Sequence, residues 1–133
     1  MPPRLQLTSI TVGCPNPREL AAFYARLLEA RTTANEPPMP DEPETAGWAQ
    51  IRSTSDRGTI TLSFEYESEW RTPTWPSQPG KQHITQHLDI FVDDLERAVE
   101  WAIECGARQA ACQPQADVRV MLDPAGHPFC LFR

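Results

Sequence analysis

Two stretches of the chain show the same change in hydrophobic period. In the stretch 87–107, apolar residues first alternate with other residues, as in a strand: Leu88, Ile90 and Val92. The spacing then becomes that of one helix face: Leu95, Ala98, Val99, Ala102 and Ile103. Residues 9–28 follow the same order, with Ser9 in register with His87 and no gap between the two stretches. The chain therefore contains an internal repeat of a whole module.

The ends of both predicted helices carry capping residues. Asn16 is a natural N-cap, and Glu19 three residues later completes an Asn-x-x-Glu capping box. Asp93 or Asp94 can cap the second helix, and Gly106 can end it.

Three strands are predicted after each helix. After the first helix they lie near residues 31–35, 47–53 and 58–67, and after the second near 108–112, 117–122 and 128–132. Each half thus reads β-α-β-β-β, which predicts an α+β fold of two tandem βαβββ modules. We expect one domain over residues 1–133, with module one at about 5–67, a linker at about 68–84 and module two at about 85–133.

Strand parity separates an apolar face from a polar face in each half. The apolar faces must lie under the helices, and the opposite faces carry Ser9, Thr11, Thr61, Ser63, Glu65, His87, Asp89 and Cys130. Such a face can simply meet water, or the two sheets can curl toward each other around a cleft. The faces have few lysines, many small polar groups and aromatic residues such as Trp48, which favours a small-molecule cleft.

Composition narrows the class of protein. The chain has 133 residues, 40% of them hydrophobic, and a net charge of −6 without a basic run, which argues against nucleic-acid binding. No apolar stretch is long enough to span a membrane, and the N-terminus has no apolar signal core, so we expect a cytoplasmic protein. The four cysteines show no CxxC spacing, which favours reduced thiols over a disulfide or metal framework.

Three further residues lie in predicted turns or in the linker. His127 follows Gly126 in a predicted tight turn, and we expect it at the surface. We expect Trp70 and Trp75 in the linker to pack their own loop, with stacking on a ligand or a partner subunit as the alternative.

The segments HLDIFVDDLERAVEWAIECGA and DPAGHPFCLF resemble the glyoxalase/bleomycin-resistance/dioxygenase superfamily, also called vicinal oxygen chelate proteins, and its glyoxalase-like subgroup. SITVGCPNPRELAAFYARLLEA is similar to the opening of the first module in that superfamily. The resemblance implies paired βαβββ modules that form an open, barrel-like cleft, and it implies a homodimer.

Metal-dependent members of this superfamily hold a divalent ion with four inward residues. The corresponding positions are Ser9, Glu65, His87 and Cys130, so two of the four match the usual pattern. We therefore expect no metal and no other cofactor. A zinc ion held by Glu65, His87 and a Cys130 thiolate is the disfavoured alternative.

The resulting hypothesis is metal-independent binding of a small molecule, as in bleomycin-resistance proteins, which sequester cationic ligands. The candidate ligand-binding residues are Ser9, Trp48, Ser63, Asp89 and Cys130, and any chemistry would use His87 and Glu65. The alternative is a metal-dependent lyase, isomerase or dioxygenase that uses Glu65 and His87 with Cys130. A structural or regulatory module with a vestigial cleft is the third hypothesis, and the sequence leaves open whether any reaction is catalysed.

Overall fold

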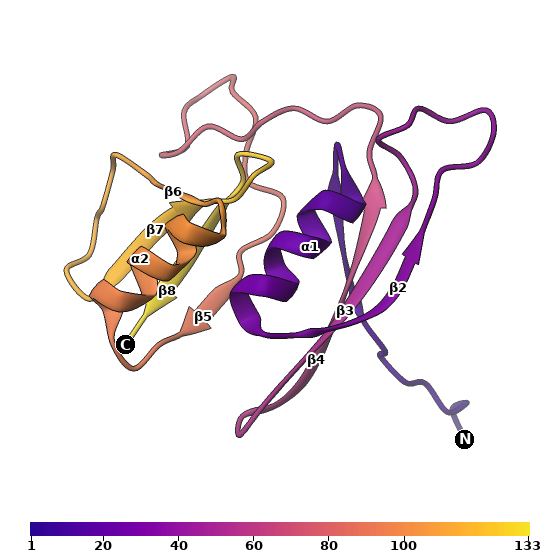
Figure 1. Ribbon diagram of the computed structural model, residues 1–133, viewed down its shortest axis with the longest axis horizontal. Helices are drawn as coiled ribbons and strands as arrows, with labels where there is room; N and C mark the ends of the chain where they lie inside the picture. The colour runs from indigo at the N-terminus through magenta and orange to yellow at the C-terminus, as the bar shows by residue number, and fades with distance from the viewer.

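The computed structural model describes all residues, 1–133, and contains two helices and two four-stranded sheets (Figure 1). The first module comprises β1 (Ile10–Cys14), α1 (Pro17–Leu28), β2 (Arg31–Glu36), β3 (Trp48–Ser55) and β4 (Gly58–Tyr66). The second comprises β5 (Asp89–Phe91), α2 (Leu95–Cys105), β6 (Arg108–Gln109), β7 (Val118–Leu122) and β8 (Pro128–Phe132). Neither helix has the length and apolar character needed to cross a bilayer.

Both helices begin where their sequences predict. The Asn16 side chain accepts a hydrogen bond from the Glu19 backbone N–H at 3.4 Å and donates one to the Glu19 carboxylate at 2.8 Å. At the second helix Asp94, rather than Asp93, is the N-cap, and its carboxylate accepts from the Arg97 backbone N–H at 3.1 Å. These contacts satisfy backbone donors that an α-helix leaves free at its first turn.

The two sheets share one topology. Their strand orders are β1-β4-β3-β2 and β5-β8-β7-β6, and in each the first strand pairs in parallel with the fourth while the other pairs are antiparallel. This confirms the predicted α+β fold of two βαβββ modules. The sheets remain open and do not close into a barrel. Strand β6 is shorter than predicted, with two residues paired to β7.

Helix α1 packs against both sheets. Its apolar side chains belong to one core cluster that also contains β3 and β4 residues of the first sheet and Phe129 and Leu131 of the second. The Phe129 ring lies 6.0 Å from Phe23 and 5.8 Å from Tyr24, centroid to centroid. The Tyr24 hydroxyl donates to the Asp123 carboxylate at 2.8 Å, so a polar contact also joins the modules. The apolar faces of both sheets are therefore covered by a shared core, and their other faces point away from it.

His127 is buried, with 1% of its surface exposed, and the expectation of an exposed turn residue was wrong. Its Nε2 accepts from the Thr85 backbone N–H at 2.8 Å, and its Nδ1 donates to the Pro128 carbonyl at 2.9 Å. Because both partners are backbone groups with fixed roles, the ring is neutral with its proton on Nδ1. The linker covers this turn: a Cβ on Gly126, which has φ +83°, would come within 2.7 Å of Thr72. The turn motif in the sequence did not predict that the linker would pack over His127.

Stability should fall as the pH drops below about 6.5, because burial lowers the pKa of His127 from its ordinary value of 6.5. Below pH 6.5 the imidazole of His127 binds a proton in the unfolded chain but not in the folded one. The contribution of His127 to the free energy of unfolding is therefore complete above pH 6.5 and decreases, as the pH falls toward the folded pKa, by up to about 1.4 kcal/mol per pH unit. Burial raises the pKa of Asp123 above its ordinary value of 3.8, so the folded carboxyl group binds a proton more readily than the unfolded one. Asp123 therefore lowers stability as the pH rises above 3.8, which is opposite in sign to the effect of His127. Urea unfolding of wild type and His127→Gln across this pH range measures the difference. An equal slope in both proteins would exclude His127 as the source.

Candidate functional site

The outer face of the second sheet carries the most organised set of candidate residues. Strand register places Asp89 of β5 beside Cys130 of β8, and Cys130 beside Val120 of β7. The Ala110 backbone N–H donates to the Val120 carbonyl at 3.0 Å, which extends this row across the sheet. A second row runs through Phe91, Phe132 and Val118. The first row therefore passes from a polar residue on β5 to an apolar residue on β7, whereas the second row is apolar throughout.

His87, Asp89 and Cys130 form a cluster at the polar edge. The His87 Nε2 lies 3.0 Å from the Cys130 Sγ and 3.6 Å from the Asp89 Oδ1. One ligating atom from each residue falls within 4.8 Å of the other two. His87 and Asp89 are exposed, whereas Cys130 is buried. Burial, followed by the charge of Asp89, raises the pKa of the Cys130 thiol, so the sulfur is protonated at neutral pH.

This cluster is not arranged as a nucleophilic triad. In such triads the base uses one ring nitrogen toward the nucleophile and the other toward the orienting carboxylate. Here the same nitrogen of His87 faces both Cys130 and Asp89. The thiol is also disfavoured as a thiolate, which is the nucleophilic form of cysteine. The geometry therefore supports binding or ligation rather than attack by Cys130.

Trp75 supplies the wall on the apolar side of the face. It packs against a small cluster of buried residues, Ala110, Val120 and Cys130. Its indole Nε1 donates to the Cys112 carbonyl at 3.0 Å, which fixes the ring on the sheet. Trp75 therefore packs on the second sheet rather than only on its own loop, and stacking on a ligand or a partner subunit stays a prediction. Proline-rich sequence around it gave no signal of this position.

The first-module candidates lie on the other sheet. Ser63 is buried and accepts a hydrogen bond from Gln50 at 3.1 Å, and the Gln50 carbonyl accepts from Thr33 at 2.8 Å. Glu65 is exposed and sits opposite the half-buried Trp48 in the β3–β4 ladder. Ser9 precedes β1 and is half-buried. The structure thus brings His87, Asp89 and Cys130 together, whereas Glu65 is not part of this cluster.

The four cysteines are free, as their spacing predicted. Burial raises the pKa of Cys14 to about 12, which makes it an inert core thiol.

Comparison with known proteins assigns the chain to a family. A model of the glyoxalase-like domain matches residues 9–132. The chain belongs to the glyoxalase-like domain family. No curated protein matches it.

Several solved structures share its fold at low identity. The fosfomycin resistance protein FosX from Mesorhizobium loti is 13% identical with a TM-score of 0.62, over 96% of this chain and 90% of that one. A glyoxalase family protein from Enterococcus faecalis is 16% identical with a TM-score of 0.62, over 96% and 97% of the two chains. TioX from Micromonospora sp. ML1 is 14% identical with a TM-score of 0.57, over 96% and 98%. At these identities the structural likeness shows a shared fold alone and leaves the reaction open.

Proposed function

We propose that this glyoxalase-like protein binds a small organic molecule on the outer face of its second sheet, without a resident metal. The row from Asp89 through Cys130 to Val120 is the observation that carries the proposal, because an exposed carboxylate there adjoins a buried apolar cluster against which the half-buried Trp75 packs. Trp75 borders the apolar end of this row. Such a surface suits a ligand with a hydrogen-bond donor or cationic group at one end and an aromatic or aliphatic body.

The charge of the site favours a cationic group over an anionic one. Asp89 is exposed at the rim, and the chain as a whole has a net charge of −6. The aromatic rings of Phe91 and Phe132, 5.8 Å apart, extend the face beyond the row, and the Arg57 guanidinium lies 4.2 Å from the centroid of the Phe91 ring. A homodimer remains our expectation for the assembly.

Thermal-shift measurements test the proposal with bleomycin and smaller aromatic cations as probes. A ligand present at a hundred times its Kd should stabilise the native state by about 2.7 kcal/mol. Asp89→Asn and Trp75→Ala should reduce the shift, since each removes one end of the binding surface. Asp117→Asn, which changes an exposed aspartate elsewhere in the second module, is the matched control. The proposal fails if no probe stabilises the chain, or if the two site variants respond like the control.

The cluster of His87, Asp89 and Cys130 favours a second candidate function, a metal-dependent lyase, isomerase or dioxygenase. Imidazole, carboxylate and thiolate together fit zinc, and three protein ligands would leave a position for substrate. The 3.0 Å separation of Nε2 and Sγ is a hydrogen-bond distance, and ligation would also require loss of the thiol proton. When bound, the ion would polarise a substrate oxygen. In this site Asp89 would be the carboxylate ligand, a role that the sequence hypothesis assigned to Glu65.

Metal analysis separates the two candidates. Protein purified without chelator is assayed for metal content, then titrated with Co²⁺ and followed by its visible absorption. A stoichiometric ion that is lost in Cys130→Ser and His87→Ala would support the metal-dependent candidate. A metal-free chain that shows no Co²⁺ absorption and still binds an organic cation would support the first.

A further inference from the structure

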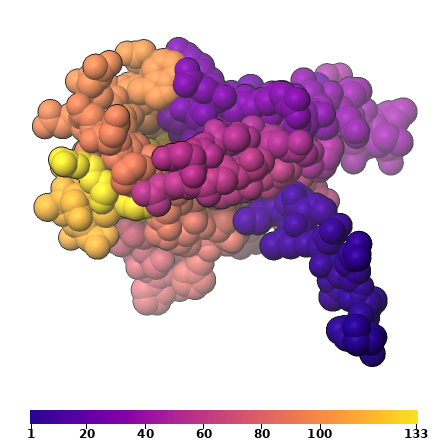
Figure 2. Space-filling model, turned by 90° about the horizontal axis from the view of Figure 1, so that it is seen from below, coloured from indigo at the N-terminus to yellow at the C-terminus, as the bar shows by residue number.

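Arg57 is a residue of the first module whose side chain reaches the candidate site on the second sheet. It lies at the tip of the β3–β4 hairpin, in the short turn between Ser55 and Gly58. Its guanidinium carbon is 4.2 Å from the centroid of the Phe91 ring on β5. Figure 2 shows the magenta tip of this hairpin against the orange and yellow surface of the second module. The two modules therefore meet at the candidate site as well as in their shared core.

The turn that carries Arg57 is fixed by local hydrogen bonds. The Arg57 backbone N–H donates to the Ser55 hydroxyl at 3.1 Å, and the hydroxyl oxygens of Thr54 and Thr59 lie 3.1 Å apart across the base of the turn. Gly58 has a φ of +113°, which a residue with a side chain rarely adopts, so the glycine permits the tight return of the chain into β4. The arginine side chain therefore leaves the hairpin in a defined direction.

The guanidinium group of Arg57 has hydrogen-bond donors to offer a ligand. It has no carboxylate partner, because the one ion pair of the chain joins His87 and Asp89, and it donates no hydrogen bond to another group of the protein. A guanidinium has five N–H donors in a planar fork, and contact with one aromatic ring leaves donors free. Such a fork matches the two oxygens of a carboxylate. The side chain is thus held by an aromatic contact and can receive an anion.

Asp89 supplies the opposite charge on the same face. Asp89 and Phe91 are two residues apart on β5, so their side chains project from one face at a spacing of about 6.6 Å. Because Arg57 lies over Phe91 and makes no ion pair with Asp89, the two charges stand apart. The Phe132 ring, 5.8 Å from that of Phe91, adds aromatic surface beside them. The face therefore offers one negative and one positive group next to an aromatic patch.

We infer that the ligand of this face is a zwitterion with an aromatic body, in which an amine and a carboxylate lie a few bonds apart. The amine lies beside Asp89, the carboxylate accepts hydrogen bonds from Arg57, and the ring rests near Phe132. This ligand class rests on the proposed function and adds to it an anionic group and the residue that selects for it. Arg57 is then a specificity-determining residue that the first module contributes to a site on the second.

Isothermal titration calorimetry with three indole probes tests this ligand class. Tryptophan carries both charges, tryptamine carries the cation alone, and indolepropionate carries the anion alone, whereas the ring is the same in all three. We expect tryptophan to bind about tenfold more tightly than either of the others, because it makes one more charge-assisted contact.

Arg57→Gln separates the role of the arginine from that of the rest of the site. It should weaken the binding of tryptophan and indolepropionate about tenfold. Its affinity for tryptamine should stay equal or rise, because the removed charge repels an amine. Arg57→Lys should recover part of the lost affinity, since it restores the charge without the planar fork.

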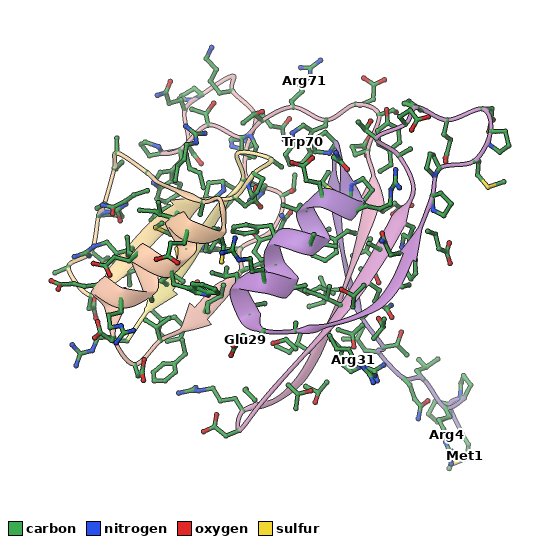
Figure 3. All side chains as sticks on the ribbon, viewed as in Figure 1. Met1, Arg4, Glu29, Arg31, Trp70 and Arg71 are labelled. Atoms are coloured by element: carbon green, nitrogen blue, oxygen red, sulfur yellow. The ribbon has the colours of Figure 1, made fainter.

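Asp89→Asn and a control arginine complete the set. Asp89→Asn should weaken tryptophan and tryptamine and leave indolepropionate equal or tighter, since it removes the negative charge alone. Arg4→Gln is the matched control for Arg57→Gln and should change none of the affinities. Arg4 is an exposed arginine that Figure 3 shows near the N-terminal end of the chain, away from the second module.

The outcomes separate the zwitterionic ligand from the proposed function. Tryptamine that binds as tightly as tryptophan, with its affinity lost in Asp89→Asn, would leave the proposed function standing and overturn the zwitterion. An Arg57→Gln chain that binds tryptophan like wild type would overturn it as well. No binding of any of the three probes would also overturn it, and the proposed function would then depend on the thermal-shift result with bleomycin and aromatic cations.

Discussion

Replacing Phe129 with alanine is expected to lower the free energy of unfolding by about 3–5 kcal/mol. The side chain is fully buried, and its ring packs edge-on against Phe23 and Tyr24 of α1. Its loss removes apolar burial and leaves a cavity at the place where α1 of the first module meets β8 of the second. Urea unfolding followed by far-ultraviolet circular dichroism measures the change in stability.

Phe132→Ala is the matched control on the same strand. Phe132 is half-buried, and its aromatic neighbour is Phe91 on the outer face. Its truncation should cost clearly less than that of Phe129, because partly exposed sites lose less burial. Equal losses in both variants would contradict a core shared by the modules. Separate unfolding steps for the two modules in the wild-type chain would contradict it in a different way.

The elements of the fold were readable from sequence because each is a local pattern. The change from period two to the helical period at Val92 marks the passage from strand to helix, and the capping box at Asn16 marks another helix start. Those signals depend on neighbouring residues only, so one chain is enough to find them. Strand β6 was overestimated, because its two paired residues are followed by Ala110, which bonds to Val120 without continuing the strand.

Long-range contacts limited the prediction of the site. Parity showed which side of each strand is apolar, but not that α1 would lie against both sheets. Strand parity placed His87 and Cys130 on polar faces, and the family resemblance placed both at ligand positions; the structure brings them together because the residues just before β5 lie beside β8. Glu65 belongs to the other sheet, and no local pattern fixes the distance between modules. Trp75 and His127 owe their positions to the linker, whose path has no periodic signal.

The Asp123→Ala variant is expected to lose about 3 kcal/mol or more of stability, because it leaves two buried donors and one partly buried donor without an acceptor. The Asp123 carboxylate accepts hydrogen bonds from the Tyr24 hydroxyl at 2.8 Å, the Ala125 backbone N–H at 2.9 Å and the His127 backbone N–H at 3.0 Å. These bonds offset the desolvation that raises the pKa of the carboxyl group. Chemical denaturation at pH 7 measures the loss, and Asp117→Ala, at an exposed aspartate, should stay within about 0.5 kcal/mol of wild type.

A double-mutant cycle with Tyr24→Phe isolates the contact between the modules. Tyr24→Phe alone removes one hydrogen bond to an ionised group and should cost about 1.5–3 kcal/mol. Combined with Asp123→Ala it should cost less than the sum of the single changes, by about 0.5–3 kcal/mol, since the second substitution finds the shared bond already absent. Strict additivity would mean that the Tyr24 hydroxyl and the Asp123 carboxylate do not stabilise each other. The turn would then be held to β8 by its backbone bonds alone, and α1 would join the modules through apolar packing without this polar link.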